Sequence, residues 1–144
     1  MHMPRDSRQD FKVALDAYQT QARAWAVTCF GVEDANNLTE RAHRVLEEAL
    51  ELAQSLGCTR ADAHTLVDYV FNRPTGLVSQ EAGGVMLSLS VLCGAAGVNL
   101  GWNAISELQR VIFFSETIRK KNAGKPHGSP LPAVVPRDPP DVIS

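Results

Sequence analysis

The chain has 144 residues, of which 44% are hydrophobic and 21% are charged, and its formal net charge is −2. This length suits one domain, and the composition is typical of a soluble globular protein. The near-neutral charge excludes the basic footprint of a protein that binds a nucleic-acid polymer. The polar start, MHMPRDSRQD, argues against a signal peptide, and the uncharged run 85–100 is too short for a membrane span. We therefore expect a cytoplasmic protein with no membrane partner.

The three cysteines, Cys29, Cys58 and Cys93, lie far apart and form no CxxC pair. This spacing argues against a zinc site or a disulfide framework, so reduced thiols are expected.

Apolar residues recur with helical periodicity along most of the chain. Apolar residues at i, i+3, i+4 spacing predict a helix over 8–29 that stops at Gly31. A second helix is predicted from Asn37, with Glu40 as its capping-box partner, to Gly57. Later start signals predict three more helices, a short one over about 60–72, one from Ser79 to about 96, and one from Asn99 to the cationic turn 119–121.

The sequence thus predicts an all-α fold, with a four-helix-type bundle and one short extra helix over residues 1–122. Residues 123–144 hold most of the eight prolines, so we expect this segment to be a proline-rich, extended or disordered tail.

The second predicted helix contains the acidic stretch EEALE, residues 47–51. On a helical wheel Glu47, Glu48 and Glu51 lie opposite the apolar stripe that includes Leu46 and Leu50, which favours an ordinary solvated face. The like-charge pairs at i+3 and i+4 cost a few tenths of a kcal/mol each. A bound Mg²⁺ would remove this repulsion, because it prefers oxygen ligands. Both interpretations remain open from the residues alone.

A further carboxylate, Glu81, opens the next long predicted helix, which is apolar on nearly every side. It is either a first-turn anion stabilised by the helix dipole or half of a two-helix site.

These two elements resemble the MazG-like, all-α nucleoside triphosphate pyrophosphohydrolase superfamily, whose signature is E-E-x-x-E followed by E-x-x-D on a later helix. The first half matches fully, whereas in the second Glu81 matches and Gly84 stands where an aspartate is expected. The resemblance implies a hydrolase that binds Mg²⁺, with Mn²⁺ as an alternative, and cleaves a nucleoside triphosphate to a monophosphate and pyrophosphate. It implies that Glu48, Glu51 and Glu81 are metal ligands and that Glu47 and Glu48 are catalytic. It also implies a homodimer or homotetramer.

Three cations of the last predicted helix, Arg119, Lys120 and Lys121, are candidates for binding the substrate phosphates. They equally suit the negative end of a helix dipole.

Gly84 leaves three alternatives open. Water can replace the missing ligand, or another acid such as Asp68 or Glu40 can reach the site. Otherwise the chain is a degenerate, non-catalytic helical relative that binds nucleotides or a protein partner. A weaker alternative changes the substrate to a phosphoribosyl nucleotide such as phosphoribosyl-ATP, and no residue pattern indicates a base or sugar preference.

Overall fold

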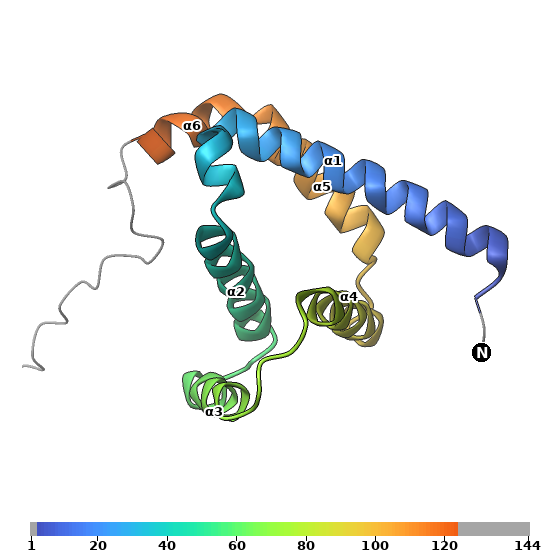
Figure 1. Cartoon of the computed structure of the whole chain (residues 1–144), viewed down its shortest axis with the longest axis vertical. Helices are drawn as coiled ribbons and strands as arrows, with labels where there is room; N and C mark the ends of the chain where they lie inside the picture. The colour runs from blue at the N-terminus through green and yellow to red at the C-terminus, as the bar shows by residue number, and fades with distance from the viewer. Residues whose placement is uncertain (1–2, 124–144) are drawn as a thin grey trace, which may run out of the picture.

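A computed structural model describes residues 3–123, and every regular element in this range is an α-helix (Figure 1). The all-α prediction is confirmed for this part of the chain. The predicted tail 123–144 lies outside the described residues except for its first residue. The helices, in order, are α1 (Arg5–Asn36), α2 (Leu38–Ser55), α3 (Arg60–Phe71), α4 (Val78–Ala95), α5 (Leu100–Phe113) and α6 (Ser115–Ala123).

Side-chain caps fix the starts of three helices. The Asn37 side chain accepts from the backbone N–H of Glu40 at 3.1 Å, and Asn99 accepts from that of Trp102 at 2.8 Å. Thr59 and Asp62 form a full capping box at the start of α3. These bonds satisfy N–H groups that a helix leaves unpaired in its first turn. The predicted starts at Asn37, Thr59 and Asn99 are therefore confirmed.

The predicted stop at Gly31 coincides with a break in helical geometry, where Gly31 has φ 85° and ψ 165°, although a second helical segment continues α1 to Asn36 beyond this kink. This backbone conformation is open mainly to glycine. Two other predicted boundaries are wrong. The residue that caps α4 is Leu77, without a side-chain hydrogen bond, rather than Ser79. The last predicted helix is divided in two, because the chain leaves helical geometry at Phe114.

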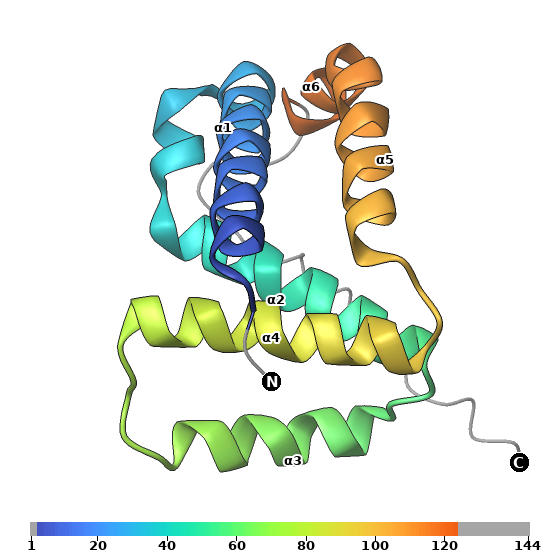
Figure 2. The same cartoon turned by 90° about the vertical axis from the view of Figure 1, so that its right-hand side faces the viewer.

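Helices α1 and α5 run parallel to each other, and together with α6 they form the most closely packed part of the described chain (Figure 2). The Tyr18 hydroxyl donates to the carbonyl of Ala104 at 3.3 Å, and the Trp25 indole donates to that of Val111 at 3.1 Å. The two donors are seven residues apart on α1, and the two acceptors are seven residues apart on α5, which is two helical turns in each case. One face of α1 therefore packs along one face of α5. The buried Cys29 thiol lies 3.7 Å from the carbonyl of Ser115 and extends the contact to α6.

The remaining helices, α2, α3 and α4, are packed less closely. Helix α2 leaves the end of α1, while α3 and α4 extend away from α1, α5 and α6 (Figures 1 and 2). Within residues 3–123, closely packed pairs involve only α1, α2, α5 and α6. The buried hydrophobic side chains of this range are only Cys29, Ala35, Cys93 and Leu108. Helix α4, which is apolar on nearly every side, therefore has only Cys93 buried within the described chain.

The three cysteines form no disulfide within residues 3–123, and Cys29 and Cys93 are buried.

Candidate functional site

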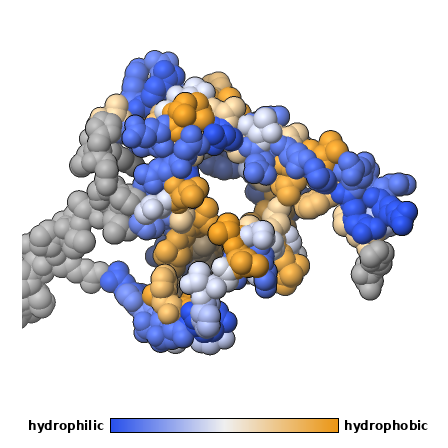
Figure 3. All heavy atoms as spheres, viewed as in Figure 1, coloured by the Kyte–Doolittle hydropathy of each residue, from blue (hydrophilic) through white to orange (hydrophobic). Residues whose placement is uncertain are grey.

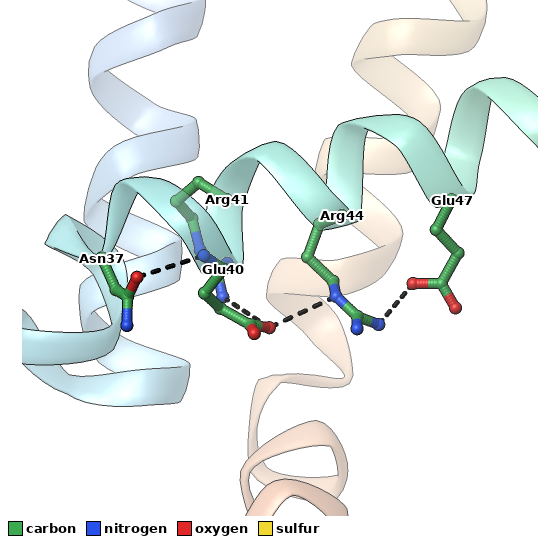
Figure 4. A network of polar contacts seen from close by, with 5 residues as sticks. All are labelled: Asn37, Glu40, Arg41, Arg44 and Glu47. Atoms are coloured by element: carbon green, nitrogen blue, oxygen red, sulfur yellow. Dashed lines mark hydrogen bonds and ion pairs between the residues drawn. The ribbon is translucent and has the colours of Figure 1, made fainter. Parts of the chain in front are cut away.

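Helix α2 carries a chain of ion pairs along one side (Figure 4). The Arg44 guanidinium lies 3.2 Å from the Glu40 carboxylate and also contacts that of Glu47. Arg41 lies 3.3 Å from the same Glu40 carboxylate. Glu40 therefore neutralises two arginines rather than closing the predicted capping box, and the Asn37 N–H donates to the carbonyl of Asp34 instead. Glu47 is held by Arg44 one turn before it, which restricts its rotamer.

Glu48 and Glu51 lie one turn apart on the exposed surface of α2. Within residues 3–123 neither side chain forms an ion pair at 4.0 Å or less. Glu48 also interacts through its charge with a cation of α5, Arg110. The pKa of Arg110 is raised mainly by its hydrogen bonds and charge interaction with Glu107, and more weakly by the charge of Glu48. Two carboxylates of α2 are thus left available for a ligand.

A groove of about 480 Å³ lies between α2 and α3. Its α2 wall includes His43, Glu47 and Glu51, and its α3 wall includes Arg60 and His64. The remaining lining is largely apolar and includes Leu46, Leu50 and Val67. The His43 Nδ1 atom is buried and has no hydrogen-bond partner among the described residues. The α2 wall therefore carries both acidic and basic side chains, Arg44 among them, and it faces basic side chains on the α3 wall.

Glu81 lies on a different helix, α4, from the other three candidate glutamates. It lies in the first turn of α4, and its carboxylate folds back over the turn at Gly76, where an added Cβ would lie 2.0 Å from Glu81 Oε1. It does not line the groove between α2 and α3. At Gly84, one turn later, an added Cβ would meet no atom within 4 Å. The position expected to carry an aspartate is therefore sterically open.

The four glutamates do not form one metal site within a single chain. Among the described residues no three His, Cys, Asp or Glu side chains are grouped so as to hold a metal ion. Glu48 and Glu51 alone do suit a magnesium site with few protein ligands, because Mg²⁺ is often held by one or two carboxylates together with water and substrate phosphates. The donor chemistry of α2 therefore suits the ion, while a four-glutamate set is not assembled.

The predicted phosphate-binding cations lie on α6, which packs against α1 and α5. Arg119, Lys120 and Lys121 are exposed, and Lys120 lies 3.2 Å from Glu116. None of the three lines the groove, and α6 and α3 lie at opposite ends of the molecule in both views (Figures 1 and 2). The structure therefore does not bring these cations to the acidic residues of α2.

Sequence reasoning missed that His43 and His64 share one groove, since each looked isolated on its own helix. A signal was present: His43, Glu47 and Glu51 recur at a spacing of four, and Arg60 and His64 do so on the next helix. Such spacing places residues on one face of each helix. The spacing does not show that the two faces meet, because this depends on the tertiary structure.

No protein-family model matches the chain, and neither a curated protein nor a solved structure was found to be similar to it.

Proposed function

We propose that this protein is a Mg²⁺-dependent nucleotide pyrophosphohydrolase that converts a nucleoside triphosphate to a monophosphate and pyrophosphate in the cytoplasm. The observation that carries the proposal is the pair of exposed carboxylates, Glu48 and Glu51, without an ion-pair partner in residues 3–123. Glu51 lines the groove, which has basic side chains on its walls, and Glu48 lies outside its lining, three residues before Glu51 on α2. Uncompensated carboxylates one turn apart repel each other, and a divalent cation removes that cost.

Each residue of the site has a distinct role in this proposal. Glu48 and Glu51 would hold the ion, which, when bound, neutralises phosphate charge and favours attack by water. Glu47, fixed by Arg44, orients the attacking water by accepting its hydrogen bond. Arg60 and His64 donate to phosphate oxygens from the opposite wall. Phosphoryl transfer depends mainly on such positioning and charge stabilisation.

Glu81 is proposed as a further ligand only in an assembled form of the protein, because α4 carries it away from the groove within one chain. The predicted four-helix-type bundle is likewise proposed for the assembled form of the protein. Arg119, Lys120 and Lys121 are no longer required for it, since Arg60 and His64 lie closer to the acidic face.

The test is pyrophosphate release from a panel of nucleoside triphosphates, with and without Mg²⁺. In Glu48→Gln we expect the rate to fall at least about 100-fold, equivalent to about 2.7 kcal/mol of barrier. Glu33→Gln is the matched control, because Glu33 is an exposed glutamate on α1 outside the groove, and its rate should be unchanged. Equal rates for wild type and Glu48→Gln, or no turnover of any nucleotide by wild type, would refute the proposal.

A second candidate is a nucleotide-binding protein that no longer catalyses hydrolysis. Two observations favour it: Gly84 supplies no ligand, and the described part of a single chain assembles no three-residue metal group. This candidate predicts Mg²⁺-dependent nucleotide binding by calorimetry without pyrophosphate release.

A further inference from the structure

The side of α5 that points away from α1 carries exposed aromatic side chains. At about 100° per residue, Trp102, Ser106, Gln109 and Phe113 fall on one side of the helix, which we call the outer face of α5. The residues of α5 that accept hydrogen bonds from α1 fall on the opposite side. Trp102 is 70% exposed and Phe113 is 82% exposed. No described helix lies beyond this face in Figure 2, so α5 is covered only on its inner side.

Phe113 and Phe114 form an edge-to-face pair at the end of the outer face. Their ring centroids are 5.0 Å apart, and the ring planes meet at 85°. Both side chains are exposed, whereas the rings of the pair Trp25 and Phe30 are half-buried. Extended proline-rich segments dock on aromatic-lined surfaces. The outer face therefore has the chemistry of a site for such a segment.

The spacing of the two aromatic ends matches a segment in this chain. Trp102 and Phe113 are 11 residues apart, which is about 16 Å along a helix. A polyproline II segment rises about 3.1 Å per residue, so five residues cover nearly the same distance. Leu131 and Pro136, in the stretch PLPAVVP, are five residues apart. The polar residues between the aromatic ends can donate to the carbonyls of this segment, which forms no internal hydrogen bonds in the polyproline II conformation.

This stretch is also tethered close to the outer face. Residues 124–144, which lie outside the described range, follow α6 directly and contain six of the eight prolines. Pro130 comes seven residues after Ala123, so the connection can span up to about 23 Å. Phe113 lies ten residues before Ala123, about 15 Å away at the helical rise. A segment on so short a connection has an effective concentration in the millimolar range, which favours it over a separate partner.

We propose that the outer face of α5 binds residues 130–136 of the same chain as an extended segment. Leu131 packs on the pair Phe113 and Phe114, and Pro136 packs on Trp102. The contact removes apolar surface from water, and the prolines lose little conformational freedom on docking. The formal charges of residues 124–144 cancel, so the cationic α6 does not repel the segment.

A second exposed apolar area is a poorer match for this segment. Hydrophobic side chains gather around the hollow between α2 and α4 (Figure 3). On the neighbouring α3, Phe71 is 82% exposed, as Phe113 is, but it has no ring partner among the described residues. Helix α3 also lies at the opposite end of the molecule from α6 (Figures 1 and 2). Phe71 therefore provides a matched control for Phe113.

Trypsin cleavage after Arg137 of the full chain, followed by mass spectrometry, tests this inference. Arg137 directly follows the docked stretch, and cleavage requires that its flanking residues be released from α5. We expect wild type to be cleaved at least about tenfold more slowly than Phe113→Ser, because cleavage follows the population of the open form. Phe71→Ser should be cleaved as slowly as wild type.

Leu131→Ser changes the other side of the contact and should accelerate cleavage as Phe113→Ser does. Because Leu131 lies outside the described helices, this variant decides the question if Phe113→Ser does not fold. The double variant should be cleaved no faster than either single variant, since both substitutions remove one contact.

Equal cleavage rates for wild type and Leu131→Ser would overturn the inference. Cleavage that slows as protein concentration rises would place the segment on another copy and would overturn it too. So would an open segment in wild type together with an outer face that binds an added polyproline peptide, because the face would then serve a separate partner. None of these outcomes depends on nucleotide hydrolysis, so this inference and the proposed function fail separately.

Discussion

The three glutamates of the EEALE stretch, Glu47, Glu48 and Glu51, differ because of one arginine. Arg44 pairs with Glu47 and Glu40 but not with Glu48, although Glu48 lies four residues after it, a spacing that also allows pairing. Glu47 is therefore held by an ion pair, whereas Glu48 and Glu51 form no ion pair within the described residues. Sequence spacing identified all three glutamates as neighbours, but it could not say which of them the single nearby arginine would select.

Gly84 allows a direct test of whether α4 takes part in the metal site. An aspartate fits there without a clash and lies on the same face of α4 as Glu81, three residues earlier. We expect Gly84→Asp to lower the Mg²⁺ concentration for half-maximal pyrophosphate release about tenfold, equivalent to about 1.4 kcal/mol. The control is Gly84→Ala, which adds the same Cβ without a carboxylate and also favours the helix over glycine.

Two other results of these variants would each have a distinct meaning. Activity that appears only in Gly84→Asp identifies a lapsed enzyme. An unchanged Mg²⁺ dependence in both variants shows that α4 lies outside the metal site, and Glu81 is then only a first-turn anion at a helix N-terminus.

At the scale of single elements, the sequence predicted best where a local signal determines the structure. The capping residues Asn37, Thr59 and Asn99 act through bonds to backbone groups within three positions, so their effect is visible in the sequence. The glycine at position 31 predicts a stop, and helical geometry does break there at φ 85°, yet a further helical segment follows it. A glycine permits such a kink, but contacts elsewhere in the chain decide whether it ends the helix.

The capping box of α3 makes its first turn sensitive to pH. The Asp62 carboxylate accepts from the Thr59 hydroxyl at 2.6 Å and from its N–H at 2.9 Å, and these bonds lower the pKa of Asp62 below its ordinary value of 3.8. A lowered folded-state pKa stabilises α3 above the unfolded value, and this contribution is lost as pH falls through the folded-state pKa.

Thr59→Ala should therefore raise the Asp62 titration midpoint toward 3.8, as followed by carboxyl carbon NMR. It should also destabilise α3 by about 1 kcal/mol. Thr65→Ala is the control within the same helix, because the Thr65 hydroxyl bonds only to the carbonyl of Ala61 one turn before it. An Asp62 midpoint that is the same in wild type and Thr59→Ala would contradict the assigned cause.

At the scale of the whole molecule, periodicity predicted helices correctly but could not place them. The apolar stripe of α2, with Leu46 and Leu50, has the pattern of a core-facing surface, yet both residues are about half exposed in the single chain. A helical wheel identifies a face that must be covered, whereas it does not say whether the cover comes from the same chain or from another copy. The bundle expected from the sequence is therefore left incomplete, and the groove beside Glu47 and Glu51 was not foreseen.

The two halves of the chain should respond differently to dilution. Helices α1, α5 and α6 are tied to one another by bonds such as those from Tyr18 and Trp25, whereas α3 and α4 have no close packing partner among the described helices. If a second subunit covers α3 and α4, their amides become exposed when the dimer dissociates. Hydrogen exchange followed by mass spectrometry should therefore speed up in residues 60–95 on dilution, and much less in residues 15–29 and 104–113. The latter segments serve as the internal control, and uniform rates across all helices at every concentration would contradict a subunit interface centred on α3 and α4.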